Sequence, residues 1–116
     1  MKTIIMDLQQ PYFDQIVSNE KIYECRAFDD KCKQLNLLDV IEFTNKDQSH
    51  KVFITSLTIY NSFHDALLDR GFENIVPSET NIEDDVKVYY DIPGYIEKEE
   101  KYGVVLIGFK KYSNDI

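Results

Sequence analysis

The run Val104–Phe109, which reads Val-Val-Leu-Ile-Gly-Phe, sets the strongest limit on the fold of this chain. Strands at the surface of a sheet alternate apolar and polar residues, because one of their faces meets water. This run is apolar on both faces, so we place it centrally in a sheet. A chain of 116 residues supplies one packed core, and residues 1–116 are therefore predicted to form a single domain.

Hydrophobic periodicity and turn signals predict the other elements. Strands are predicted at residues 3–8, 22–27, 40–43 and 51–60, and the first of them is expected to be well buried. Helices are predicted at residues 10–17, 62–71, between Asn81 and Pro93, and at 95–101, with a helical turn at 29–35. This order predicts an α+β fold, with a strongly curved sheet or small open barrel flanked by helices.

Local signals support several of these helix boundaries. Ser62 precedes a helix in the form of a capping box, and Gly71 is a natural place for that helix to end. Asn81 is predicted to cap the next helix. In the first helix, Phe13, Ile16 and Val17 have the spacing of an inward-facing stripe.

The strand at residues 22–27 is expected to have one apolar and one polar face. Side chains alternate along a strand, so Tyr23, Cys25 and Ala27 share the face predicted to be core. Glu24 and Arg26 share the other face. These two residues can simply pair with each other, or they can jointly hold a polar ligand, and the strand alone leaves both interpretations open.

The charge of the chain is unevenly distributed. The formal net charge is −8, so the molecule as a whole repels polyanions, and nucleic-acid binding requires a local basic patch. Six of the 13 Lys and Arg residues lie between Lys21 and Lys51. A basic stretch formed by Lys21, Arg26, Lys31 and Lys33 is the candidate patch.

Neither a metal nor a cofactor is predicted from the sequence. Cys25 and Cys32 form no metal motif with a nearby His, and their number suggests a reducing compartment. His64 and the acidic pairs and runs at 84–85 and 97–100 are interpreted as solvated helix faces. No signal peptide or membrane-spanning segment is apparent, so we expect an intracellular, cytoplasmic protein.

The arrangement of motifs resembles the ASCH domains of the PUA-like superfamily. The family pattern Gly-x-Lys-x-x-Glu-x-Arg is similar to residues Asn19–Arg26, and Gly-Asp-x-Ile-x-Phe is similar to Leu38–Phe43. Other segments that resemble the family are Tyr12-Phe13-Asp14, Ile16-Val17, Tyr60–Phe63 and Lys101–Val105. The resemblance covers nearly the whole chain with its elements in order, and it implies the PUA-like fold.

Two turns depart from the family pattern, because Asn19 and Leu38 stand where glycine is usual. Asn tolerates the left-handed backbone conformation that such turns require. Leu is strained at positive φ, so the turn at Leu38 is expected to have a different shape.

The resemblance implies that the domain binds RNA or a nucleotide in a polar cleft. Lys21 and Arg26 would contact phosphate or a base edge, Glu24 would accept from an exocyclic amine, and a Tyr would stack on the base. Lys31 and Lys33 would extend the binding surface. One ring of the pair Tyr89–Tyr90 is available to border the cleft.

Two alternatives remain from the sequence. A bacterial subgroup of similar proteins hydrolyses the acetyl amide of N-acetylated cytidine with a Lys, a Thr and a Glu; these would correspond to Lys21, to Glu24 in place of the Thr, and to Glu79 or Glu73. In that case Lys21 and Glu24 would be catalytic. In the second alternative, the Glu24–Arg26 pair is structural and the domain is a protein-interaction module.

Overall fold

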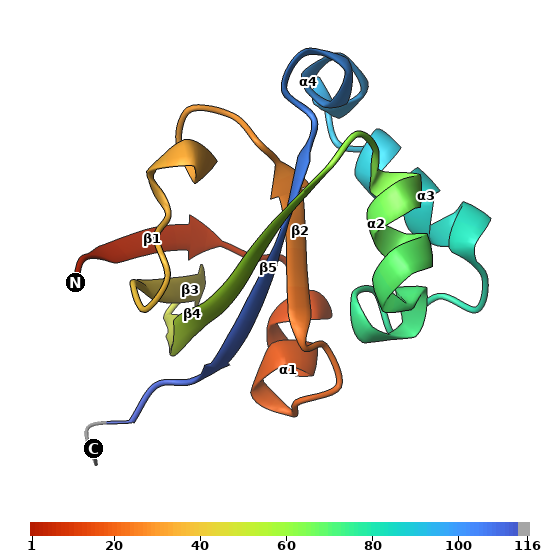
Figure 1. The fold of residues 1–116 in the computed structure, drawn as a ribbon. Coiled ribbons are helices and arrows are strands. Elements are labelled where there is room, and N and C mark those ends of the chain that lie inside the picture. Colours follow the sequence, from red (N-terminus) through yellow and green to blue (C-terminus); the bar gives the residue numbers. More distant parts are fainter. Residues whose placement is uncertain (114–116) are drawn as a thin grey trace.

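The computed structural model describes residues 1–113 and contains one curled five-stranded sheet flanked by helices (Figure 1). The strand order is β1-β3-β4-β5-β2. β1 pairs in parallel with β3, and the other neighbours are antiparallel. The strands are β1 (Thr3–Asp7), β2 (Tyr23–Ala27), β3 (Val40–Asn45), β4 (Gln48–Tyr60) and β5 (Val104–Lys111). The predicted α+β class with a curved sheet is confirmed.

Four α-helices and two short 3₁₀ turns connect the strands within residues 1–113. They are α1 (Tyr12–Val17), η1 (Cys32–Gln34), α2 (Phe63–Arg70), η2 (Phe72–Asn74), α3 (Ile82–Tyr90) and α4 (Tyr95–Tyr102). The predicted caps are present: Ser62 Oγ accepts from the Asp65 N–H at 3.0 Å, and Asn81 Oδ1 accepts from the Asp84 N–H at 2.9 Å. Figure 1 shows α2 and α3 side by side next to the sheet.

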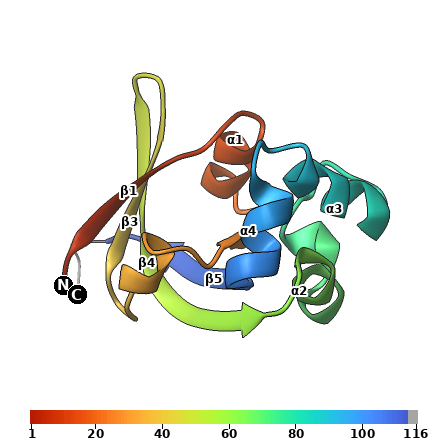
Figure 2. The ribbon, with the colours of Figure 1, turned by 90° about the horizontal axis from the view of Figure 1, so that it is seen from above.

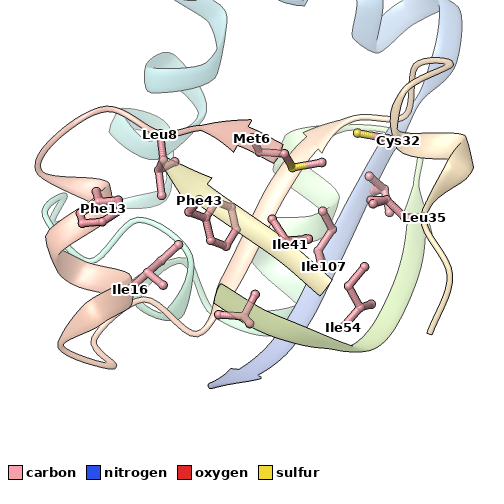
Figure 3. Packing of buried hydrophobic residues seen from close by; sticks show 12 residues of the cluster. Met6, Leu8, Phe13, Ile16, Cys32, Leu35, Ile41, Phe43, Ile54 and Ile107 are labelled. Carbon is pink, nitrogen blue, oxygen red and sulfur yellow. The ribbon is translucent and has the colours of Figure 1, made fainter. Parts of the chain in front are cut away.

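β5 lies inside the sheet and is covered on both faces, as its sequence predicted. Val105 and Ile107 pack into a cluster within the curl of the sheet, where Figure 3 shows Ile107 near Ile41 and Ile54. Val104 and Leu106 point to the opposite face and pack beneath α2 and α3. β4 bends strongly along its length (Figure 2), with a register shift between Ile54 and Ser56.

The curl brings the two edge strands, β1 and β2, toward each other without a backbone ladder between them. Side chains bridge this seam. Arg26 Nη2 donates to the Asp7 carbonyl at 2.9 Å, and Lys31 Nζ donates to the Ile5 carbonyl at 2.9 Å. Two backbone carbonyls at the edge of β1 therefore accept hydrogen bonds from cationic side chains, one within β2 (Arg26) and one in the segment after it (Lys31).

Three sequence expectations about burial and backbone were wrong. β1 is an edge strand, and Ile5 is 57% exposed rather than well buried. Val17 lies at the end of α1 and is exposed. Leu38 was expected to avoid positive φ, but its φ is 70°. Hydrogen bonds hold this turn: the Leu38 N–H donates to the Ile54 carbonyl at 2.8 Å. The Asp39 carboxylate accepts from the backbone N–H groups of Lys2 and Asn36, each at 3.1 Å.

Candidate functional site

A pocket of about 210 Å³ lies where the end of β1 meets β2, beneath α3 and the start of α4. Its wall combines the ionic side chains Lys21, Glu24 and Arg26 with the rings of Tyr12, Tyr89 and Tyr95 and with apolar side chains such as Val76, Val88 and Ile92. The structure thus brings together the three residues of the predicted Lys-x-x-Glu-x-Arg strand at one pocket.

Lys21 enters this pocket from the turn that precedes β2. Asn19 takes positive φ, 68°, as its sequence position predicted, and the Lys21 N–H then donates to the Gln15 carbonyl at 3.0 Å. The Lys21 residue is only 2% exposed, and its ammonium donates to the Ile75 carbonyl. Its Nζ also lies 3.2 Å from Glu24 Oε1. A buried ammonium needs such partners, because desolvation of an isolated charge is costly.

Glu24 is the centre of the ionic group. Its Oε1 faces Lys21, and its Oε2 accepts from Arg26 Nε at 2.8 Å. Burial acts to raise the pKa of Glu24, but Lys21 and Arg26 outweigh it and hold that pKa below its usual range. Glu24 therefore stays ionised with both oxygens occupied, which favours a role as an anchor for the two cations.

The polar face of β2 is more enclosed than its alternation suggested. Cys25 and Ala27 are buried as predicted, and Tyr23 is half-buried. Glu24, on the opposite face, is also buried, while the Arg26 side chain keeps 21% of its surface exposed. Alternation correctly assigned the faces, but it contains no information about the helices that cover the polar one.

Aromatic rings also line the pocket. Tyr89 stacks on Phe63 with ring centroids 4.3 Å apart and an interplanar angle of 7°. Tyr95 also stacks on Phe63, at 5.7 Å and 10°. Phe63 is fully buried, so it fixes two of the three tyrosines that line the pocket. Of the pair Tyr89–Tyr90, the ring that borders the pocket is Tyr89.

Asp85 is the residue that sequence reasoning missed. It was expected on a solvated face of its helix, but it is fully buried, and neither carboxylate oxygen has a hydrogen-bond partner among the described residues. Burial, followed by the nearby charge of Glu79, raises its pKa to about 7, although the positive charge of Lys21 opposes this shift. The sequence contained one signal for it: Asp85 lies one helical turn before Tyr89, and one ring of the pair Tyr89–Tyr90 was a candidate to border the cleft.

Lys31 and Lys33 are not brought into the pocket. Both are exposed, as expected. Lys31 bridges the seam between β1 and β2, and the Lys33 ammonium lies over the rings of Phe28 and Tyr102, at 5.7 and 5.5 Å from their centroids. The two lysines therefore flank the region instead of lining the pocket.

Other residues considered from the sequence fall outside the pocket. His64 is exposed. Glu99 is not on a solvated helix face, because it accepts from the Phe63 N–H at 2.8 Å and from the Tyr90 hydroxyl at 2.7 Å, which ties α4 to α2 and α3. Glu73 is exposed and Glu79 is half-buried, and neither lines the pocket.

The side chains offer no evident place for a metal. Within residues 1–113, no group of three or more His, Cys, Asp or Glu residues could hold a metal ion. Cys25 and Cys32 are free, buried thiols; burial raises both pKa values, that of Cys32 to about 12. No helix of the described part of the chain is long and apolar enough to cross a membrane.

Comparisons with known proteins agree on the family. The ASCH domain model matches residues 6–113. Hypothetical protein PH0355 superimposes with a TM-score of 0.86 at 35% identity, covering 97% of this chain and 100% of its own. Protein PF0455 from Pyrococcus furiosus gives 0.76 at 33% identity, covering 96% and 98%.

A more distant structure has the same fold. The ASCH protein from Zymomonas mobilis gives a TM-score of 0.63 at 14% identity, covering 96% of this chain and 68% of its own. A search among curated proteins gives no significant match. The match over residues 6–113 shows that the chain belongs to the ASCH domain family.

Proposed function

We propose that this protein binds single-stranded RNA or a nucleotide, with one base in the pocket beside Lys21, Glu24 and Arg26. The ASCH family is generally thought to bind RNA. The observation that carries the proposal for this chain is the composition of the pocket, which is lined both by a buried ionic group and by tyrosine rings that stack on Phe63. Proteins that recognise unpaired RNA bases combine aromatic stacking with polar contacts to the base edges.

The size of the pocket favours a single base over a duplex. Pockets for drug-sized ligands typically enclose roughly 300–1,000 Å³. The pocket here encloses about 210 Å³, which is enough for a small planar group. A duplex keeps its bases stacked inside the helix, so a base can enter only from a single strand or as a free nucleotide.

The charges at the site favour an anionic ligand despite the acidic chain. Two cations and one carboxylate give the group Lys21, Glu24 and Arg26 a net charge of +1. Arg26 is the most exposed of the three, and two of its nitrogens are engaged, Nε with Glu24 and Nη2 with the Asp7 carbonyl. A guanidinium has five N–H donors, so Arg26 retains capacity for a phosphate oxygen at the rim.

Fluorescence anisotropy with labelled single-stranded RNA octamers tests the proposal. Tyr95→Ala removes a pocket ring, and stacking of one base contributes roughly 1–3 kcal/mol, so its affinity should fall about tenfold. Tyr102→Ala is the matched control, because Tyr102 lies at the other end of α4 and does not line the pocket. Equal affinity of both variants and wild type, or no binding by wild type at low salt, would contradict the proposal.

Hydrolysis of an N-acetylated cytidine is the second candidate. Glu24 is a poor nucleophile or base here, because both of its oxygens are bound to cations. Burial raises the pKa of Asp85 to about 7, but Asp85 does not line the pocket, so it could act as the base only if it reached the substrate. Incubation with N-acetylated cytidine and chromatography for cytidine tests it. Formation of cytidine by wild type and not by Lys21→Ala would establish hydrolysis. If wild type forms no cytidine but Glu24→Thr does, the glutamate at position 24 is what prevents hydrolysis in wild type.

The alternative that the domain is a protein-interaction module predicts no RNA binding in the anisotropy assay and no hydrolysis of N-acetylated cytidine. If the Glu24–Arg26 pair is purely structural, neither RNA nor the acetylated nucleoside should bind in the pocket. Nuclear magnetic resonance titration with each ligand would then leave the resonances of Tyr12 and Tyr95 unchanged.

A further inference from the structure

Asp85 is a buried carboxyl group that the fold leaves without a hydrogen-bond partner. The residue is 0% exposed, and both carboxylate oxygens are unpaired within residues 1–113. Buried polar groups are nearly always paired, and a buried carboxylate usually faces a cation or several N–H groups. An exception of this kind inside a small domain requires an explanation.

Asp85 lies close in α3 to residues that line the pocket, although it does not line the pocket itself. It precedes Val88 and Tyr89 by one turn of α3, and both of these residues line the pocket. The positive charge of Lys21 acts on it, although the Lys21 ammonium is bound to Glu24 and to the Ile75 carbonyl. Asp85 therefore adds a second carboxyl group to the field around one buried lysine.

We propose that the proton on Asp85 sets the net charge beside Lys21 and thereby controls how tightly the pocket holds an anionic ligand; this inference rests on the function proposed above. With Asp85 protonated, the group formed with Lys21, Glu24 and Arg26 has a net charge of +1. With Asp85 ionised, the net charge is zero. Binding of a phosphate-bearing ligand should therefore tighten as Asp85 takes up its proton.

The neighbours of Asp85 place this change near neutral pH. Burial raises the pKa of Asp85 to about 7, and the negative charges of Glu79, Asp84 and Glu73 act in the same direction, while Lys21 opposes them. The titratable and charged groups that interact with Asp85 are Glu79, Lys21, Asp84, Glu73, Tyr12 and Tyr89. Lys21 is the cation of this set, so the charge of Asp85 bears directly on the residue that we expect to attract the ligand.

Binding of a fluorescein-labelled single-stranded RNA octamer at pH 6 and pH 8 tests the proposal. A unit charge within about 10 Å of the ligand, at an effective dielectric constant near 20, changes affinity about tenfold. We expect wild type to bind about tenfold more tightly at pH 6 than at pH 8. Asp85→Asn should bind equally at both values, because its side chain is neutral at each.

Glu83→Gln is the matched control, because it removes an exposed carboxylate from the first turn of α3 that is not among the groups named above as acting on Asp85. It should bind RNA with the same pH dependence as wild type. Both histidines are retained in all three proteins, so a difference between the proteins does not come from histidine. A pH dependence in Asp85→Asn equal to that of wild type would overturn the proposal.

A ligand-free measurement separates this inference from the proposed function. The ¹³Cε resonance of Lys21 should shift with an inflection near pH 7 in wild type and Glu83→Gln, and this inflection should disappear in Asp85→Asn. If RNA does not bind but the inflection is present, the coupling of Asp85 to Lys21 is supported and the proposed function fails. If wild type shows no inflection, the inference fails whether or not RNA binds.

Discussion

Replacement of Asp85 by Asn should abolish a pH dependence of stability that the wild-type fold carries. The carboxyl of Asp85 is buried without a hydrogen-bond partner among the described residues, and its pKa rises from 3.8 to about 7 on folding. Between these values the native state binds more protons than the unfolded state, so stability falls as pH rises from about 4 to 7 and stays low above that range. Asn keeps the shape of the side chain and has no charge to bury.

The magnitude follows from the difference between the two pKa values. Each pKa unit corresponds to about 1.4 kcal/mol, so ionisation of Asp85 costs about 4 kcal/mol in the folded protein at high pH. About 3 kcal/mol of this penalty should develop between pH 4.5 and pH 8.5. Stability differences of this size are large for a domain of 116 residues, whose total stability is typically about 5–15 kcal/mol.

Urea denaturation at a series of pH values measures this effect. The free energy of unfolding of Asp85→Asn minus that of wild type should increase by about 3 kcal/mol from pH 4.5 to pH 8.5. Glu83→Gln should give a curve parallel to that of wild type, because Glu83 is exposed and is not among the charges that act on Asp85. Parallel curves for Asp85→Asn and wild type would refute the reasoning, since they would mean that Asp85 is ionised and well solvated or paired in the native state.

Three further predictions have definite expected outcomes. Glu24→Gln should destabilise the fold by about 3–5 kcal/mol in urea denaturation, because it leaves Lys21 and Arg26 without their buried counterion. Lys2→Gln is the control: it removes an exposed partner of Asp39 and should destabilise the fold by less than about 1 kcal/mol. Leu38→Gly should stabilise the fold by about 1 kcal/mol in thermal denaturation, because φ is 70° and the side chain is 61% exposed; a loss of stability would show that this leucine contributes by packing. Replacing both Lys31 and Lys33 with Ala should weaken RNA binding roughly two- to threefold at low salt and leave the fold intact, and unchanged binding would exclude these lysines from the interface.

Local sequence signals were sufficient for most of the fold. The apolar run Val104–Phe109 predicted an interior strand, and β5 lies between β4 and β2. Ser62, Asn81 and Asn19 predicted two helix caps and a left-handed turn, and all three are present. These features depend on residues within a few positions of one another, so a single sequence contains the necessary information.

Leu38 shows where a local rule fails. The cost of positive φ for a leucine is roughly 1–2 kcal/mol, and this cost argued for a different turn. The turn is nevertheless held by hydrogen bonds from Lys2 to Asp39 and from Leu38 to Ile54, whose partners lie far away in the chain. Tertiary hydrogen bonds of this kind can outweigh a local conformational cost, and a sequence window around Leu38 does not contain them.

The candidate site was predictable in its ionic residues but not in its environment. The alternation of β2 placed Glu24 and Arg26 on one face, the resemblance to the family pattern predicted Lys21 beside them, and in the structure Lys21 and Arg26 both pair with Glu24. Burial of that face depends on α3 and α4, which lie more than 50 residues further along the chain. Because burial and neighbouring charge decide the ionisation of a carboxyl group, the same packing keeps Glu24 charged while it brings the pKa of Asp85 to about 7. The two carboxyl groups, which are of one chemical type, therefore ionise in different pH ranges, because Glu24 has two buried cations as partners and Asp85 has no hydrogen-bond partner among the described residues.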